Sequence, residues 1–210
     1  MRPNLRIKRN LVLEPVGLRI EDLPSTVDGR VLFGNDHPLE LEIGSGKGTF
    51  LTEQARERPE INFAGLEHAR NYWMYSADRL RRNECFNVRL VLGDAAAFVS
   101  ELLADSCLSA IHIYFPDPWP KTRHRKRRLV QGHFLSDVER VLRVGGRLQI
   151  VTDHRTYFEQ IERVLQGSKL DQTEYRTPGS VAEGEIAGTN FERKYRREGR
   201  PFHAIAAIKA

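Results

Sequence analysis

Residues 39–50 read LELEIGSGKGTF, an alternating apolar strand that runs into closely spaced glycines and then into a helix-forming stretch. Glycine tolerates positive φ and has no side chain, so a ligand can approach the backbone at Gly44 and Gly46, and the following helix start offers unpaired N–H groups. Glu42 precedes the first glycine and would repel the pyrophosphate of a dinucleotide. Its carboxylate suits a ligand with an ammonium or a sulfonium, and S-adenosylmethionine carries both. The glycine pattern alone is equally typical of an ordinary strand-to-helix turn.

Acidic residues also end the next two strand-like runs. Glu67 closes NFAGLE, 23 residues after Gly44, and Asp94 closes VRLVLGD. Ligands of parallel α/β sheets bind at the carboxyl ends of the strands, where an acidic residue placed like Glu67 accepts both ribose hydroxyls. Each carboxylate alone could be a solvated loop residue. Their joint placement predicts a cofactor site with Asp94 at the adenine end.

Residues 114–121, YFPDPWPK, form a proline-rich loop at the end of the fourth strand-like run. Three prolines stiffen the backbone and remove donors, which fits a loop that holds a planar substrate. Asp117 and Trp119 are expected to face the ligand cleft. Trp119 could equally anchor the core, whereas a carboxylate between two prolines beside a cofactor site has few structural reasons to be there. Asp117 is therefore a candidate functional residue.

Two dense basic sets indicate contact with a polyanion. The first follows the proline-rich loop, and like charges at such density repel one another until phosphates neutralise them. The second surrounds Phe191 and Tyr195, an arrangement that suits phosphate contact combined with base stacking. Solvation of a helix entry is the alternative for the first set. The first set comprises Arg123, His124, Arg125, Lys126, Arg127 and Arg128, and the second comprises Arg193, Lys194, Arg196, Arg197 and Arg200.

The elements that must position these residues alternate between strands and helices. This alternation predicts a Rossmann-like, doubly wound α/β fold with a mostly parallel seven-stranded sheet and an antiparallel C-terminal edge, because no long helix separates the last two strands. Residues 1–37 show no convincing periodicity and are expected to form a partly ordered arm. The predicted strands cover residues 39–43, 62–67, 88–94, 110–119, 146–153, 171–176 and 202–210, and the predicted helices cover residues 48–58, 70–83, 95–104, 130–142 and 157–165.

Composition limits the class of protein. The 210 residues suit one domain with a small extension, and a net charge of +5 with a pI of about 9.4 favours a polyanionic partner. Cys85 and Cys107 do not have the spacing of metal ligands or of a redox-active pair. The histidines His68, His154 and His203 likewise do not indicate a metal site. No export signal and no apolar run of about 18 residues is present. We expect a cytoplasmic protein with no bound metal and no membrane partner.

Five short motifs together carry a resemblance to a known family. They are residues 42–48 (EIGSGKG), 115–119 (FPDPW) with Lys121, 123–128 (RHRKRR), 152–153 (TD) and 189–192 (TNFE). From about Leu39 to its end, the chain resembles the bacterial tRNA (guanine-N7-)-methyltransferase family. The resemblance implies a class I methyltransferase domain over residues 38–210. It also implies methyl transfer from S-adenosylmethionine to N7 of a tRNA guanosine, the one in the variable loop.

The resemblance also implies roles for individual residues. Glu42, Glu67, Asp94 and Asp117 would contact S-adenosylmethionine beside the glycine loop, and Asp117 would be the catalytic residue. The family's C-terminal motif often has a basic residue where this chain has Asn190. The implied partner is tRNA and not DNA, with a monomer or a homodimer expected. The implied substrate-binding residues are Lys121, Asp153, Thr189, Asn190, Phe191 and Glu192.

The chemistry of the implied reaction needs no general base. Guanine N7 has an in-plane lone pair, so the attack on the methyl group requires no deprotonation. Positive charge moves onto the base in the transition state, and Asp117 or Asp153 could stabilise it or accept from guanine N1–H and the exocyclic amine. The alternatives are a methyltransferase for another RNA or nucleobase, a non-catalytic RNA-binding Rossmann module and a nicotinamide dehydrogenase. Glu42 argues against the last of these.

Overall fold

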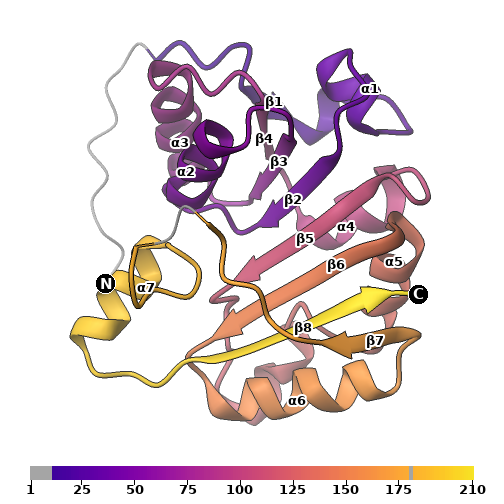
Figure 1. Ribbon diagram of the computed structural model, residues 1–210, viewed down its shortest axis with the longest axis vertical. Coiled ribbons are helices and arrows are strands. Elements are labelled where there is room, and N and C mark those ends of the chain that lie inside the picture. Colours follow the sequence, from indigo (N-terminus) through magenta and orange to yellow (C-terminus); the bar gives the residue numbers. More distant parts are fainter. Residues whose placement is uncertain (1–10, 180–181) are drawn as a thin grey trace.

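The protein folds around one twisted sheet. The computed structural model describes residues 11–179 and 182–210 (Figure 1). Its strands are β1 (Gly17–Arg19), β2 (Leu39–Ile43), β3 (Asn62–Glu67), β4 (Val88–Leu92), β5 (Leu108–Tyr114), β6 (Leu142–Thr152), β7 (Leu170–Thr173) and β8 (His203–Lys209). The strand order is β1-β4-β3-β2-β5-β6-β8-β7. Strands β1 to β6 pair in parallel, and β8 runs antiparallel to both β6 and β7.

Helices connect the parallel strands and cover both faces of the sheet (Figure 1). The α-helices are α1 (Gly29–Phe33), α2 (Thr49–Glu57), α3 (Arg70–Arg82), α4 (Ala95–Ala97), α5 (Gly132–Val141), α6 (Arg155–Gln166) and α7 (Asn190–Arg197). Shorter turns are the 3₁₀ segments η1 (Ile20–Asp22) and η3 (Thr122–Arg127) and the π segment η2 (Phe98–Leu102). This mostly parallel sheet with an antiparallel edge confirms the predicted α/β fold class.

Side chains of β2 alternate between the two faces of the sheet, as the pleat requires. Leu41 and Ile43 pack into the larger core with residues of α5 and α6. Glu40 and Glu42 belong to the opposite face, where α2 and α3 cover β2, β3 and β4. Over β5, β6 and β8 that face is crossed by the segment that follows β7, residues 174–179 (Figure 1). Polar side chains of the sheet are therefore buried under a loop as well as under helices.

The sheet has eight strands, and the prediction of seven was wrong by one. The additional strand is β1, which lies inside residues 1–37 and pairs Gly17 with Leu90 at the outer edge of β4. Three residues are too few to show the alternation by which a strand is predicted. Residues 1–10 of the expected arm lie outside the described residues.

The C-terminal region contains a helix that the sequence analysis did not predict. Helix α7 lies in the charged segment that was expected to have no long helix. Thr189 is its N-cap, and the Thr189 side chain accepts a hydrogen bond from the backbone N–H of Glu192. Threonine followed three residues later by glutamate is the pattern of a capping box, which is the signal that was missed.

Candidate active site

The glycine loop after β2 adopts a conformation that requires glycine. Gly44, Gly46 and Gly48 have φ values of 82°, 52° and 66°, all in the left-handed region. The Gly44 N–H donates to the Leu66 carbonyl at 2.8 Å, which ties the loop to the end of β3. The Gly46 N–H donates to Glu67 Oε2 at 2.9 Å. The loop is thereby held at the carboxyl ends of two neighbouring strands.

A cavity of about 390 Å³ opens between this loop and α7. It lies at the carboxyl ends of β2 and β5, where ligands bind in this type of sheet. Its wall brings together the glycine loop, the start of α2 and residues far away in the sequence. The lining residues include Glu42, Gly44, Gly46, Thr49, Phe50, Tyr72, Tyr114, Thr189, Asn190, Phe191, Lys194 and Arg197. Of the predicted site residues, six are thus brought to one cavity: Glu42, Gly44, Gly46, Thr189, Asn190 and Phe191.

Glu42 places a carboxyl group on this wall. It is 4% exposed, and its Oε2 atom finds no hydrogen-bond partner among the described residues. Burial raises the pKa of Glu42 to about 8, with a hydrogen bond from Ser45 opposing the rise and the charge of Glu67 adding to it. A cationic ligand in the cavity would supply the missing partner and favour the ionised form.

Glu67 joins the glycine loop to the turn after β3. Its Oε2 atom accepts from the Gly46 N–H, and its Oε1 atom accepts from the Ala69 N–H at 2.8 Å. Burial raises its pKa, although both backbone hydrogen bonds oppose the rise. Each oxygen has a second lone pair. Glu67 can therefore shape the loop and still accept from the hydroxyls of a ligand.

Helix α7 forms the far wall of the cavity and is fastened through its first turn. The Asn190 side chain donates to the Thr49 hydroxyl at the start of α2. Glu192 is fully buried, and its Oε2 atom accepts from the N–H groups of Ala187 (2.8 Å) and Gly188 (3.0 Å). Phe191 is 41% exposed at the cavity.

This placement changes the interpretation of Glu192, which was predicted to bind the substrate. Its Oε1 atom also accepts from the Ile186 N–H at 2.6 Å and pairs with Arg196 at 2.8 Å. With both oxygens occupied inside the chain, Glu192 organises the turn before α7 and presents no free acceptor to a ligand. The charged run around it gave no sign that this side chain turns inward.

The proline-rich loop leaves the sheet directly after β5. Phe115 and Trp119 have φ values of 53° and 41°, positions that are strained for residues with a side chain. The Arg127 guanidinium lies 5.1 Å from the Trp119 ring centroid, so this tryptophan supports the basic segment and does not line the cavity. Asp117 is exposed on the loop and is likewise outside the cavity lining.

Asp153 and Asp94, the two other predicted carboxylates, have partners within the chain. Asp153 Oδ2 pairs with Arg200 at 2.7 Å, and Arg200 also lies 4.2 Å above the Tyr195 ring. Asp94 caps α4 by accepting from the Ala97 N–H at 3.0 Å. Neither residue lines the cavity in this structure.

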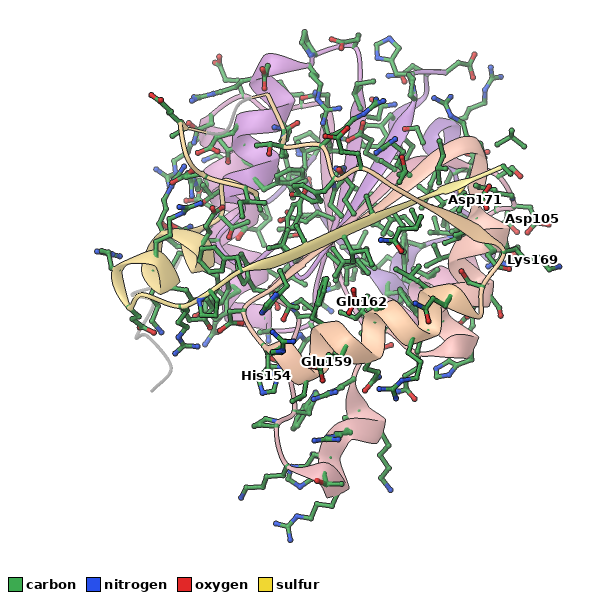
Figure 2. All side chains as sticks on the ribbon, turned by 60° about the horizontal axis from the view of Figure 1, so that its bottom comes forward. Asp105, His154, Glu159, Glu162, Lys169 and Asp171 are labelled. Atoms are coloured by element: carbon green, nitrogen blue, oxygen red, sulfur yellow. The ribbon has the colours of Figure 1, made fainter. Side chains whose placement is uncertain are left out.

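Most of the first basic set lies in η3, with Lys121 as the N-cap residue and Arg128 as the C-cap residue. Figure 2 shows this pink segment projecting from the body of the molecule, beyond the end of α6 that His154 marks. Its side chains are accessible to a large polyanion except for one. The exposed or half-exposed members are Lys121, Arg123, His124, Arg125, Lys126 and Arg127.

Arg128 is the exception, and its burial argues against the predicted RNA contact. It is 2% exposed, and its Nε atom donates to the Pro118 carbonyl at 2.8 Å. One of its terminal nitrogens donates to Gln160 Oε1 at 2.8 Å, and its guanidinium lies 4.7 Å above the Tyr157 ring. Arg128 fastens the proline-rich loop to α6, and its burial keeps it from a phosphate in solvent.

The second basic set is largely neutralised by acidic neighbours. Arg193 pairs with Glu185 at 2.7 Å and with Glu53 at 3.3 Å. Arg197 and Lys194 line the cavity. These two are therefore the cations of the set that a ligand in the cavity would meet first.

Sequence reasoning missed two tyrosines on the cavity wall. Tyr72, in the first turn of α3, and Tyr114, the last residue of β5, both line the cavity. The Tyr114 hydroxyl lies 3.0 Å from His112 Nδ1, and Phe50 packs against both rings. The strand-end position of Tyr114 was a usable signal, whereas nothing in the helix pattern singled out Tyr72.

The described ranges 11–179 and 182–210 lack two kinds of feature. Those residues contain no helix that is both long and apolar enough to cross a bilayer. They also contain no group of three or more His, Cys, Asp or Glu side chains that could hold a metal ion.

Solved structures share this architecture. A SAM-dependent methyltransferase from Aquifex aeolicus has a TM-score of 0.58 at 12% identity over 84% of each chain. The aminoglycoside resistance methyltransferase NpmB1 has a TM-score of 0.57 at 13% identity, covering 82% of this chain and 87% of that one. At these identities the likeness concerns the fold alone, which is that of class I methyltransferases.

Sequence relatives are much closer. A family model described as "Putative methyltransferase" matches residues 36–205. The tRNA (guanine-N(7)-)-methyltransferase of Rhodopirellula baltica is 39% identical over 200 residues, which cover 90% of this chain and 72% of that protein. The enzyme of the same name from Geobacillus thermodenitrificans is 36% identical over 185 residues, which cover 85% and 82% of the two chains. With the predicted resemblance confirmed, the chain belongs to the tRNA (guanine-N7-)-methyltransferase family.

Proposed function

We propose that this protein transfers the methyl group of S-adenosylmethionine to N7 of a guanosine in tRNA, the one in the variable loop, and so forms 7-methylguanosine. Membership of the family supports the activity, and the fold supports the cofactor. The observation that carries the proposal is Glu42, whose Oε2 atom is buried at the cavity wall without a partner among the described residues. A ligand that brings positive charge and N–H donors completes that site.

The cavity, together with the carboxylates at the neighbouring strand ends, fits S-adenosylmethionine. Glu42 would receive the ammonium group, and Glu67 would accept from the ribose hydroxyls while it holds the Gly46 N–H. Asp94, which follows β4, the strand next to β3 in the sheet, would lie toward the adenine. When bound, S-adenosylmethionine supplies a methyl group on a positively charged sulfur. Gly44 and Gly46 have no side chain, so the ligand can lie against the loop backbone at these two positions.

On the substrate side, Asp117 is our catalytic candidate. Guanine N7 needs no deprotonation, so this carboxylate would stabilise the positive charge that develops on the base. It is exposed on a stiff loop, where an incoming guanine would cover it and exclude water. Asp153 would be a second acceptor for the guanine edge, shared with Arg200. Lys121, Thr189, Asn190 and Phe191 are the remaining substrate contacts in this proposal.

The projecting basic segment supports a tRNA partner. Its exposed cations project from the body of the molecule, so they can contact phosphates on either side of the modified nucleotide (Figure 2). A tRNA substrate would place the protein in the cytoplasm. We infer that it works there as a monomer or a homodimer.

One assay tests the proposal. The full chain is incubated with S-adenosylmethionine labelled in its methyl group and with bulk tRNA, and the RNA is digested to nucleosides. The expected labelled product is 7-methylguanosine, with Glu42→Gln as the control that should label far less. A different labelled nucleoside would indicate another RNA methyltransferase, and tight tRNA binding without any label would indicate an RNA-binding module. Mapping the label within the tRNA tests the variable-loop position.

A further inference from the structure

A second cavity, of about 410 Å³, opens on the same face of the sheet at the opposite end of the strands. It lies near the amino ends of β2, β5 and β6, against the C-terminal end of α2 and under residues 176–179. The proposed cofactor site lies at the carboxyl ends of the strands, as ligands in this fold do. The second cavity is therefore not part of the site that methyl transfer requires.

Its lining is strongly cationic. Four arginines line it, Arg58, Arg143, Arg147 and Arg176, against a single carboxylate, Glu40. The Glu40 carboxylate is already used. Its two oxygens accept hydrogen bonds from the two terminal nitrogens of Arg58 at 2.7 and 2.9 Å. Three arginine charges are thus left facing the cavity without an ion-pair partner among residues 11–179 and 182–210.

Two of these guanidinium groups also have unmet donors. The Nε atoms of Arg58 and Arg147 are buried and have no acceptor within the described part of the chain. Arg147 uses one terminal nitrogen on the Glu174 carbonyl at 2.6 Å, and this bond does not satisfy its Nε–H. A buried N–H without an acceptor costs about 1–3 kcal/mol, so such groups are rare unless a ligand or solvent completes them.

We propose that this cavity is a binding site for a phosphate group. Guanidinium forks match the tetrahedral oxygens of phosphate, and one phosphate can accept from several arginines at once. It would also relieve the repulsion between Arg147 and Arg176: burial lowers the pKa of Arg147 most, the charge of Arg176 lowers it further, and the charge of Glu174 opposes both. The volume exceeds that of inorganic phosphate and leaves room for an organic group on the phosphate. Phosphate monoesters and the backbone phosphate of bound RNA share this chemistry.

The test is a calorimetric titration of the full chain with inorganic phosphate in chloride buffer at constant ionic strength. Arg176→Gln and Arg147→Gln should each weaken the binding about tenfold or more, because each removes a charged donor. Arg163→Gln is the matched control, since Arg163 is exposed on α6 at the other face of the sheet and should leave the affinity unchanged. Arg176 is exposed on a loop, so its variant remains informative even where Arg147→Gln fails to fold.

Two results would overturn the site: no phosphate binding by the wild-type protein, or the same affinity in Arg176→Gln as in Arg163→Gln. Titration in the presence of saturating tRNA then identifies the source of the phosphate. Displacement of phosphate by tRNA, with a salt slope of tRNA binding that is shallower by about one in Arg176→Gln, assigns the site to an RNA phosphate. Retained phosphate binding assigns it to a free phosphate ester. Because no methyl transfer is measured, the result does not depend on the proposed activity.

Discussion

Glu42 is a carboxyl group whose charge depends on what lies beside it. In the protein without ligand, burial raises its pKa to about 8 from an ordinary value of 4.5. A raised carboxyl pKa adds stability that is fully present below pH 4.5 and is lost as the pH rises through 8. A bound cation reverses this preference, because it stabilises the ionised form. Cofactor binding and proton release are therefore linked at this residue.

The first prediction follows from that linkage. S-adenosylmethionine should release up to about one proton per molecule bound at pH 7, and its affinity should rise between pH 6 and pH 8. Calorimetry in two buffers with different ionisation enthalpies measures the proton directly. Glu42→Gln should release no proton and bind about 10- to 100-fold more weakly, since a charged hydrogen bond is lost. Wild-type binding without proton release would show that Glu42 is already ionised or lies outside the site.

The second prediction concerns Asp117. If its charge stabilises the methylated base, Asp117→Asn should keep the fold and most of the tRNA affinity but lose about 10²-fold or more in kcat. Asp105→Asn is the matched control, since Asp105 is exposed and lies away from the projecting segment in Figure 2. The wild-type rate should show no rising limb with pH that the substitution removes. Such a limb would make Asp117 a general base, and normal turnover of the variant would exclude it from catalysis.

At the scale of elements, the turn before α7 is organised by one side chain. Glu192 accepts from the N–H groups of residues 186–188 and pairs with Arg196. Glu192→Gln should therefore cost about 1–3 kcal/mol of local stability and weaken S-adenosylmethionine binding, because α7 is a wall of the cofactor cavity. Hydrogen exchange over residues 186–197 measures the first effect. Glu198→Gln, which removes only exposed ion pairs, should change neither, and equal protection in both variants would contradict the role of Glu192.

Arg128 and its neighbour Lys126 give the fourth prediction, a separation of stability from RNA binding. Arg128→Gln should lower the free energy of unfolding by about 1–3 kcal/mol, because the Pro118 carbonyl loses its donor. Lys126→Gln should leave stability unchanged and weaken tRNA binding. Denaturant unfolding and tRNA titration of both variants provide the comparison. Equal stability of the two would mean that the proline-rich loop holds its position without Arg128.

Periodicity and strand-end chemistry were enough to predict most elements and the cofactor side of the cavity. The strand at residues 39–43 was predicted to the residue, and Glu42 was predicted from its place before the glycines. What a charge run cannot reveal is which of its members turns inward. Arg128 and Glu192 are buried because of partners such as Gln160, which only the folded chain brings near. Asp117 remains a prediction, since the cavity of this structure does not include it.

At the scale of the molecule, the exposed cations are concentrated on the segment that projects from the body (Figure 2). The second basic set is paired with Glu53, Glu185 and Glu192 and adds less to the surface field. The fifth prediction is that tRNA affinity falls with salt with a log–log slope of about −3 to −5, as for five to seven phosphates neutralised. S-adenosylmethionine affinity should hardly change over the same range. If tRNA affinity did not change with salt concentration, the segment would be only a solvated surface.

The position of β8 between β6 and β7 affects how the protein is made. On the ribosome β6 and β7 emerge before β8, and within the sheet neither has another partner on the side that β8 later occupies. A nascent chain therefore carries an open, apolar strand edge at β6 while the preceding parallel strands can already pair. That edge is the point at which a stalled or shortened chain would recruit another strand and aggregate.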